Sequence, residues 1–332
     1  IHLRTMPDSV TTSALRLHAF HALQPGPRLI VTGAVHGNET CGSRAIERIA
    51  QEFDRGTLVL ERGSLTLVPI TNPLAYQRGQ RMGDRNLNRN LYPNTLPQDY
   101  EDRVANVLCP LLAQHDVLLD LHSFHSTGEP FVMLGPQDNT GNLEPFAHAA
   151  REEALALCLG PRRIVEGWLH TYADGVKTRM ARASADDRAT LLSTDPRYGV
   201  GTTEYMRSQG GYGVTLECGQ HQDPDAPEVA WRAIHNTLSQ LQLIDASTPV
   251  PIAGPQMLRL TQVVDKLHGD DRFTRAWSSY DPLTAGDTIG IRHDGTPVLA
   301  HSDGFIVFPN PGAVAGNEWF YFAECSTRLV AR

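Results

Sequence analysis

The sequence predicts an α/β protein with a mixed, mostly parallel β-sheet flanked by helices, followed by a small C-terminal β domain. Strand-like and helix-like segments alternate up to about residue 241, which favours a sheet covered by helices. Three prolines and a glycine in residues 245–255 interrupt this alternation. Beyond them, short β-branched segments lie between Gly, Pro and Asp turns. We therefore predict two domains, residues 1–245 and residues 256–332.

The segments of the first domain follow from their apolar periodicity. Arg28–Val35 is an apolar run typical of a buried strand. A helix is expected near Thr40–Phe53, where Ile46, Ile49 and Phe53 recur at helical spacing. The further expected elements are strands at 65–70, 117–122 and 213–217, a helix whose apolar face runs from 104 to 112, and a helix that begins near 225. In the second domain, strands are expected at 287–292, 297–301 and 304–308.

Composition narrows the class of protein. The chain has 332 residues, 41% of them hydrophobic and 20% charged, with a formal net charge of -8. Nucleic acids and anionic membranes are poor partners for an acidic chain, because both require a basic face. The five cysteines are scattered and form no C-x-x-C pair, which is typical of a reducing compartment. With no apolar run of 18 residues and no leader-like start, we expect a cytoplasmic protein.

Three short motifs end three of the expected strands: His36-Gly-Asn-Glu39, Asp120-Leu-His122 and Leu216-Glu217. In open α/β sheets, ligands bind beyond the carboxyl ends of the strands, so these side chains are expected to meet there. Two histidines and one carboxylate are a common catalytic zinc set. The H-x-x-E pattern alone is weak, and His115, His125 and His221 compete with His122 for the role. Asp120 shares a strand face with His122 and is a candidate to orient it, the alternative being that it only caps local backbone.

Residues 78–89 hold four arginines in twelve positions, within an otherwise acidic chain. Glycines and asparagines between them favour a loop. A guanidinium presents two parallel N–H donors to a carboxylate, so the loop is a candidate for anion recognition beside the metal. The alternative is a solvated basic loop paired with surface acids.

These motifs resemble one known family. The matching residues span about 30–220 and are His36-Gly-Asn-Glu39, Asn72-Pro73, Arg81-x-x-Asp84-x-Asn86-Leu-Asn88-Arg89, Asp120-Leu-His122 and Glu217-x-Gly219. Their order and spacing resemble the succinylglutamate desuccinylase/aspartoacylase family, within the zinc carboxypeptidase-like group of folds. The resemblance implies one Zn²⁺ per chain, bound by His36, Glu39 and His122. It also implies that Glu217 is the general base that activates the zinc-bound water.

The same resemblance assigns roles to residues 78–89, here called the arginine loop. It implies that Arg81 polarises the scissile amide carbonyl, and that Asn88 and Arg89 bind the carboxylate of the released amino acid. Asn86 departs from the family, which usually has Asp there. The motifs do not place the family's further substrate-side arginine, for which Arg179 and Arg207 are the candidates.

We therefore predict a zinc-dependent amidohydrolase that deacylates a small anionic N-acyl amino acid, with residues 256–332 capping or flanking its site. The sequence allows a homo-oligomer. One alternative is a zinc carboxypeptidase or other amidase acting on a short peptide, which shares the metal and the carboxylate clamp. A second is a non-catalytic ligand-binding relative. The presence of a candidate for every chemical role, including Glu217, favours an enzyme.

Overall fold

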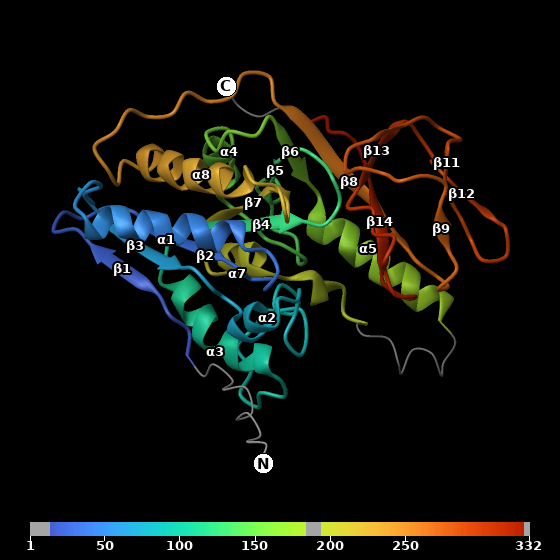
Figure 1. Cartoon of the computed structure of the whole chain (residues 1–332), viewed down its shortest axis with the longest axis horizontal. Helices are drawn as coiled ribbons and strands as arrows, with labels where there is room; N and C mark the ends of the chain where they lie inside the picture. Colours follow the sequence, from blue (N-terminus) through green and yellow to red (C-terminus); the bar gives the residue numbers. More distant parts are fainter. Residues whose placement is uncertain (1–13, 184–193, 329–332) are drawn as a thin grey trace, which may run out of the picture.

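A computed structural model describes residues 14–183 and 194–328. Within these ranges an eleven-stranded mixed sheet crosses the molecule (Figure 1). Its strands, in spatial order, are β1 (His18–His21), β3 (Ser64–Val68), β2 (Arg28–Gly33), β4 (Val117–Phe124), β7 (Tyr212–Gln220), β5 (Phe131–Met133), β6 (Arg163–Glu166), β8 (Gln256–Asp265), β14 (Glu318–Cys325), β13 (Gly304–Val307) and β10 (Pro282–Leu283). A separate three-stranded sheet contains β12 (Pro297–Leu299), β11 (Thr288–Ile291) and β9 (Arg272–Phe273).

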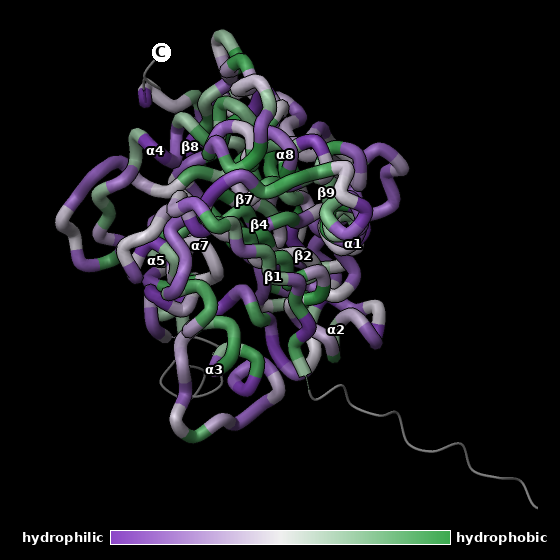
Figure 2. Tube along the Cα trace, turned by 90° about the vertical axis from the view of Figure 1, so that its left-hand side faces the viewer, coloured by the Kyte–Doolittle hydropathy of each residue, from purple (hydrophilic) through white to green (hydrophobic). Residues whose placement is uncertain are grey.

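Helices cover both faces of the sheet. One face packs against α1 (Cys41–Asp54), α4 (Ala149–Ala156) and α8 (Ala226–Gln240), whose apolar residues form one core with alternate residues of β2, β3 and β4. The other face packs against α2 (Pro73–Arg78), α3 (Tyr100–Ala113), α5 (Trp168–Arg182) and α7 (Thr202–Ser208), with the 3₁₀ turn η1 (Pro196–Gly199) before α7. Figure 2 shows the hydrophobic segments concentrated along β2, β4 and β7 in the middle of the molecule. None of the helices in the described ranges is both long enough and apolar enough to cross a membrane.

The central strands are parallel and in a register that matters for the site. β2, β3, β4 and β7 all run in one direction, so their carboxyl ends share one edge. Gly33 of β2 is the partner of Leu121 in β4, and His122 of β4 is the partner of Glu217 in β7. The motifs that follow or end these strands are thereby brought together.

The C-terminal region extends the sheet. β8 pairs in parallel with β6, and β14 then pairs antiparallel with β8. Residues 256–332 therefore meet the rest of the chain through a strand pair as well as through side chains. The division into two domains at residues 245–255 stays a prediction.

The predicted fold class is confirmed: the sheet is mixed, its central strands are parallel, helices flank it, and a small C-terminal β region follows. The expected elements lie within a few residues of the observed ones. Several elements escaped sequence analysis, including β5, β6, β8, β14 and α5. β5 and β6 are too short to show an alternation, and the pairing of the longer β8 and β14 depends on residues distant in sequence.

Candidate active site

His36, Glu39 and His122 converge at the carboxyl edge of the sheet. One donor atom from each of the three lies within 4.8 Å of the others. Glu39 is placed between the two rings, with Oε1 2.8 Å from His36 Nδ1 and Oε2 2.8 Å from His122 Nδ1. All three side chains are buried. The donor set and its spacing fit a divalent metal ion such as zinc.

The turn between β2 and α1 makes this convergence possible. His36 follows β2, and Glu39 comes immediately before α1. Gly37 packs so closely on α2 that a Cβ there would lie 1.9 Å from the carbonyl carbon of Ala75. Glycine is therefore required at this position for the turn to seat against the neighbouring helix.

The Nε2 atom of each histidine, which faces away from Glu39, has a hydrogen-bond partner of its own. His122 Nε2 lies 2.8 Å from Asp120 Oδ2, and Asp120 accepts hydrogen bonds from Thr32, at 2.6 Å, and from Thr202. His36 Nε2 lies 3.0 Å from Asn86 Oδ1. Such outer partners fix the ring orientation and leave the Nδ1 atoms for a metal. The predicted orienting position of Asp120 matches the observed contact.

The two rings differ in charge when no metal is bound. Burial, and then the positive charge of Arg81, lowers the pKa of His36 to about 4, which keeps the ring neutral. Burial also opposes a charge on His122, but Asp120 and Glu39 raise its pKa well above 6.5. A metal ion must therefore displace a proton from His122 as it binds.

Glu217 lies beside His122 in the sheet register and lines the same cavity. Its Oε2 atom is buried without a hydrogen-bond partner among the described residues. Burial is the main cause that raises the pKa of Glu217 to about 8, and the nearby Glu39 carboxylate adds to it. A buried carboxyl group without a partner, beside a candidate metal site, is suited to accept and return a proton.

The arginines of residues 78–89 have different partners, and Arg81 is the one that contacts a candidate metal ligand. The buried carboxylate of Glu101 accepts backbone N–H groups of residues 83–85, which fixes the loop. Arg81 reaches the site, where Nη1 donates to Glu39 Oε1 at 3.0 Å. Arg85 turns away and pairs with Asp99 and Asp102. Arg78 donates to the carbonyl of Gly83.

Asn88 and Arg89 lie farther along the cavity. Asn88 Oδ1 accepts the backbone N–H of Thr202 at 2.9 Å. The Arg89 guanidinium donates to the Asn88 carbonyl at 2.8 Å and lies 4.7 Å from the centre of the Trp168 ring. No carboxylate of the described residues lies within ion-pair distance of Arg89. This partly buried cation is therefore available to an anionic group of a ligand.

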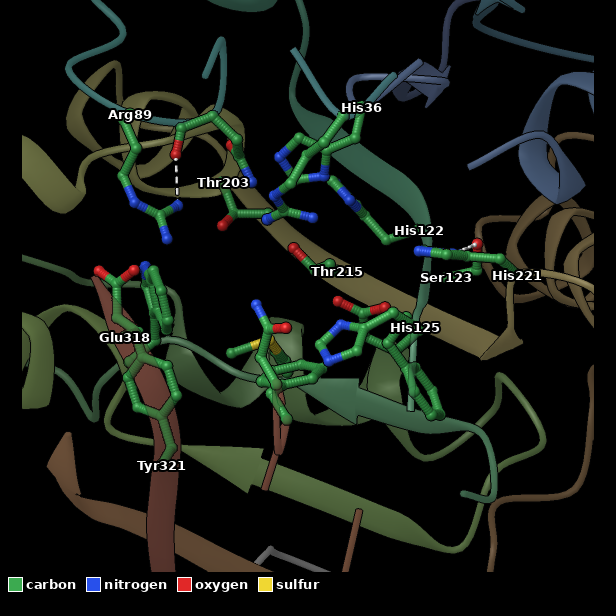
Figure 3. A pocket seen from close by; sticks show the side chains of 18 of the residues that line it. His36, Arg89, His122, Ser123, His125, Thr203, Thr215, His221, Glu318 and Tyr321 are labelled. Atoms are coloured by element: carbon green, nitrogen blue, oxygen red, sulfur yellow. Dashed lines mark hydrogen bonds between the residues drawn. The ribbon is translucent and has the colours of Figure 1, made fainter. Parts of the chain in front are cut away.

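A single cavity of about 390 Å³ joins these groups, and Figure 3 shows several of them around it. It is lined by His36, Arg81, Asn88, Arg89, His122 and Glu217 among the predicted site residues, while Glu39 contacts both histidines and is not among the lining residues. Other lining residues include Ser123, His125, Trp168, His221, Phe308, Asn310, Glu318 and Tyr321. Sequence analysis missed those from α5 and from residues 308–321, because they lie in no recognisable motif.

None of the three histidines considered as competing ligands belongs to the group of three donor residues. His125 Nε2 contacts the carbonyl of Pro309, and His221 Nδ1 contacts Ser123 Oγ at 2.9 Å. Both line the cavity, but neither joins the group of three donors. His115 is held between the Leu111 carbonyl and Thr66, away from the cavity.

Fold and site together define a class of protein: an α/β fold whose mixed sheet carries a His–Glu–His group at the carboxyl ends of its parallel strands. The chain belongs to the succinylglutamate desuccinylase/aspartoacylase family, since residues 25–239 match the model of the succinylglutamate desuccinylase/aspartoacylase catalytic domain. The predicted family membership is thereby confirmed.

Individual relatives agree with this assignment. A probable aspartoacylase of a Nostoc species is 31% identical over 121 residues, which cover 33% of this chain and 40% of that protein. An N-acyl-aromatic-L-amino acid amidohydrolase (carboxylate-forming) of Xenopus laevis is 25% identical over 87% of this chain and 91% of its own length. These names support a hydrolase.

Solved structures show the same fold. A succinylglutamate desuccinylase/aspartoacylase from Rhodobacter sphaeroides has a TM-score of 0.70 at 18% identity, covering 94% of this chain and 90% of that one. The product-bound ectoine utilization protein EutE (DoeB) from Ruegeria pomeroyi has a TM-score of 0.67 at 19% identity, covering 93% and 88%.

Proposed function

We propose that this protein is a zinc-dependent hydrolase that cleaves the amide bond of an N-acyl amino acid. The observation that carries the proposal is the convergence of His36, Glu39 and His122 within 4.8 Å beside one cavity. The same cavity presents the unpartnered Glu217 carboxyl group and a partly buried cation, Arg89, that has no ion-pair partner among the described residues. A metal-dependent hydrolase of an N-acyl amino acid uses a metal group, a base and a cation for the carboxylate, and the family assignment agrees with these features.

When bound by the three side chains, a zinc ion supplies Lewis acidity toward water and toward the amide carbonyl. Glu217 takes the proton of the attacking water as the new C–O bond forms. It then returns that proton to the nitrogen of the departing amine as the C–N bond breaks. The buried, unpartnered Oε2 atom supports this role, because no other group competes for its lone pairs.

Arg81 is proposed to stabilise the negative charge that develops on the carbonyl oxygen. Its Nη1 atom already lies 3.0 Å from Glu39, beside the candidate metal position, and nearly half of its side chain remains exposed. Arg89 and the side-chain amide of Asn88 are proposed to bind the carboxylate of the amino acid. The absence of an ion-pair partner for Arg89 within the described ranges supports that role.

The cavity favours a small substrate over a peptide. Asn310, Phe308 and Tyr321, all from the C-terminal region, line it together with His36 and His122. Residues 256–332 are therefore proposed to flank and limit the site. Its volume of about 390 Å³ accommodates an acylated amino acid.

The proposal is tested with protein stripped by a chelator and then reloaded with Zn²⁺. N-acetyl, N-succinyl and N-formyl amino acids are compared with short peptides. Reloaded protein is expected to release amino acid from at least one N-acyl class, whereas stripped protein is not. His122→Ala is expected to lose both bound zinc and activity, whereas replacing the exposed His170 in the same way keeps both. Activity that persists without metal, or cleavage of peptides alone, contradicts the proposal.

A further inference from the structure

Glu318 places a carboxylate in the cavity at the end where the amino acid is proposed to bind. It begins β14, and 29% of its side chain is exposed. In Figure 3 its carboxylate points toward the guanidinium of Arg89 across the pocket, while His36 and His122 lie farther along. Burial opposes its ionisation, but Arg89 and Arg179 hold the pKa of Glu318 below its ordinary value. An ionised acid therefore faces the proposed carboxylate site.

Arg179 and Arg207, the two candidates for the further substrate-side arginine, already have carboxylate partners. Arg179 holds Asp265 with two hydrogen bonds, of 2.9 and 2.7 Å, and contacts Glu318 Oε1 at 3.3 Å. It does not line the cavity. Arg207 does line it, but its side chain is only 2% exposed and three carboxylates surround it, those of Glu144, Glu152 and Glu204. Neither guanidinium is free to take an additional anionic group.

The charges of four neighbouring side chains at this end of the cavity cancel before a substrate arrives. Arg89 and Arg179 contribute two positive charges, and Asp265 and Glu318 contribute two negative charges. An α-carboxylate on Arg89 leaves the group with one excess negative charge. A second carboxylate, as in aspartate or glutamate, raises the excess to two, whereas an ammonium group on the substrate restores neutrality. Uncompensated charge in a partly desolvated site is costly.

We propose that the amino acid released by this enzyme carries a cationic side chain, whose ammonium group binds Glu318 while its α-carboxylate binds Arg89. This inference rests on the proposed deacylase function and specifies its substrate class. It also gives the C-terminal region a role in specificity, because Glu318 belongs to β14.

The test uses the zinc-loaded full chain and three substrates that differ in side-chain charge. They are Nα-acetylornithine, its neutral near-isostere Nα-acetylnorleucine, and the anionic Nα-acetylglutamate. Wild type is expected to favour the ornithine derivative over the norleucine derivative by at least about 10-fold in kcat/KM, as expected for a close charge pair in a cavity. Glu318→Gln is expected to reduce that ratio to about 1, with little change for the norleucine derivative.

Glu324→Gln provides the matched control, because it removes the same charge from the same strand but lies outside the cavity. It is expected to keep the wild-type ratio. Wild type that favours the neutral or anionic substrate, or a Glu318→Gln variant that keeps the wild-type ratio, overturns the proposal and leaves the deacylase function standing. If none of the three is cleaved and no other N-acyl amino acid is, the proposed function fails and this inference fails with it. The wild-type preference decides the matter even if Glu318→Gln does not fold.

Discussion

His36 and Asn86 are joined by a hydrogen bond of 3.0 Å between Nε2 of the ring and Oδ1 of the amide. The same oxygen accepts the backbone N–H of Asn88 at 2.9 Å. The Asn86 side chain thus connects a candidate metal ligand to the loop that contains Asn88 and Arg89, the two residues proposed to bind the substrate carboxylate. Family members usually have an aspartate at this position, so this chain uses a neutral acceptor where an ionised one is common.

Asn86→Ala is expected to weaken zinc binding by about 10–100-fold, because the imidazole of His36 loses the partner that orients it. Zinc affinity is measured by competition with a chromophoric chelator. Asn86→Asp is expected to bind zinc at least as tightly as wild type, since a carboxylate is a stronger acceptor. Equal affinities in wild type and Asn86→Ala contradict this role for Asn86.

Glu217→Gln is expected to lower kcat by about 10²–10⁴ while zinc content stays close to one per chain, because the amide cannot act as a base. Zinc is measured by elemental analysis and kcat with the best substrate of the N-acyl panel. Near-normal turnover in the zinc-loaded variant rules out Glu217 as the base.

Zinc binding is expected to release protons, and Glu217 is expected to contribute to them. Its pKa is raised to about 8, so in the metal-free protein the carboxyl group is mostly protonated at pH 7. A nearby cation favours the charged form, so the proton leaves as zinc binds. Calorimetry in buffers of different ionisation enthalpy counts the protons. Glu217→Gln is expected to release fewer at pH 7, and this difference is expected to vanish above about pH 9, where the metal-free carboxyl group is already ionised. A variant that matches wild type at pH 7 contradicts the assignment.

Arg81→Ala is expected to lower kcat by about 10²–10³, as for loss of one preorganised donor to a developing oxyanion. Arg78→Ala is the matched control, because Arg78 ends α2 three residues before Arg81, and the Arg81 and Arg78 side chains are 46% and 44% exposed. Steady-state kinetics on both variants separate the effects. Similar losses in both indicate that the loop, and not the position of Arg81, is responsible.

Asp271→Asn is expected to destabilise the fold by about 2 kcal/mol at neutral pH. The Asp271 carboxylate is buried and accepts hydrogen bonds from the backbone of residues 267, 268 and 293 and from Arg292. Burial opposes its charge, but these donors together hold its pKa well below the ordinary value. A lowered pKa stabilises the folded state above about pH 4, and this contribution is lost as the pH falls further.

Urea unfolding of wild type and Asp271→Asn at several pH values checks this sign. The difference in unfolding free energy is expected to be largest near pH 7 and to shrink below pH 4. Asp270→Asn, at an exposed neighbour, is expected to change little. A difference that grows on acidification contradicts the assignment.

The sequence alone predicted the central strands and the candidate metal ligands. Apolar runs located β2, β4 and β7, and the polar residues that follow or end them were expected to meet because carboxyl ends of parallel strands share an edge. His36, Glu39 and His122 depend on such local rules, and the structure brings their donor atoms together. Glu217 follows from the same rule, as the register partner of His122.

Only the tertiary structure decided which charged side chains are free. Among the candidate arginines of the described ranges, Arg89 has no carboxylate within ion-pair distance, whereas Arg179 and Arg207 are held by carboxylates distant in sequence. Arg81 lines the cavity and pairs with Glu39 beside the candidate metal position. Glu318 reaches the site because β14 pairs beside β8 at the far end of the sheet. Periodicity reports which residues are buried, but the partner of a buried charge depends on strand order and packing between residues far apart in the chain. Local patterns do not contain that information.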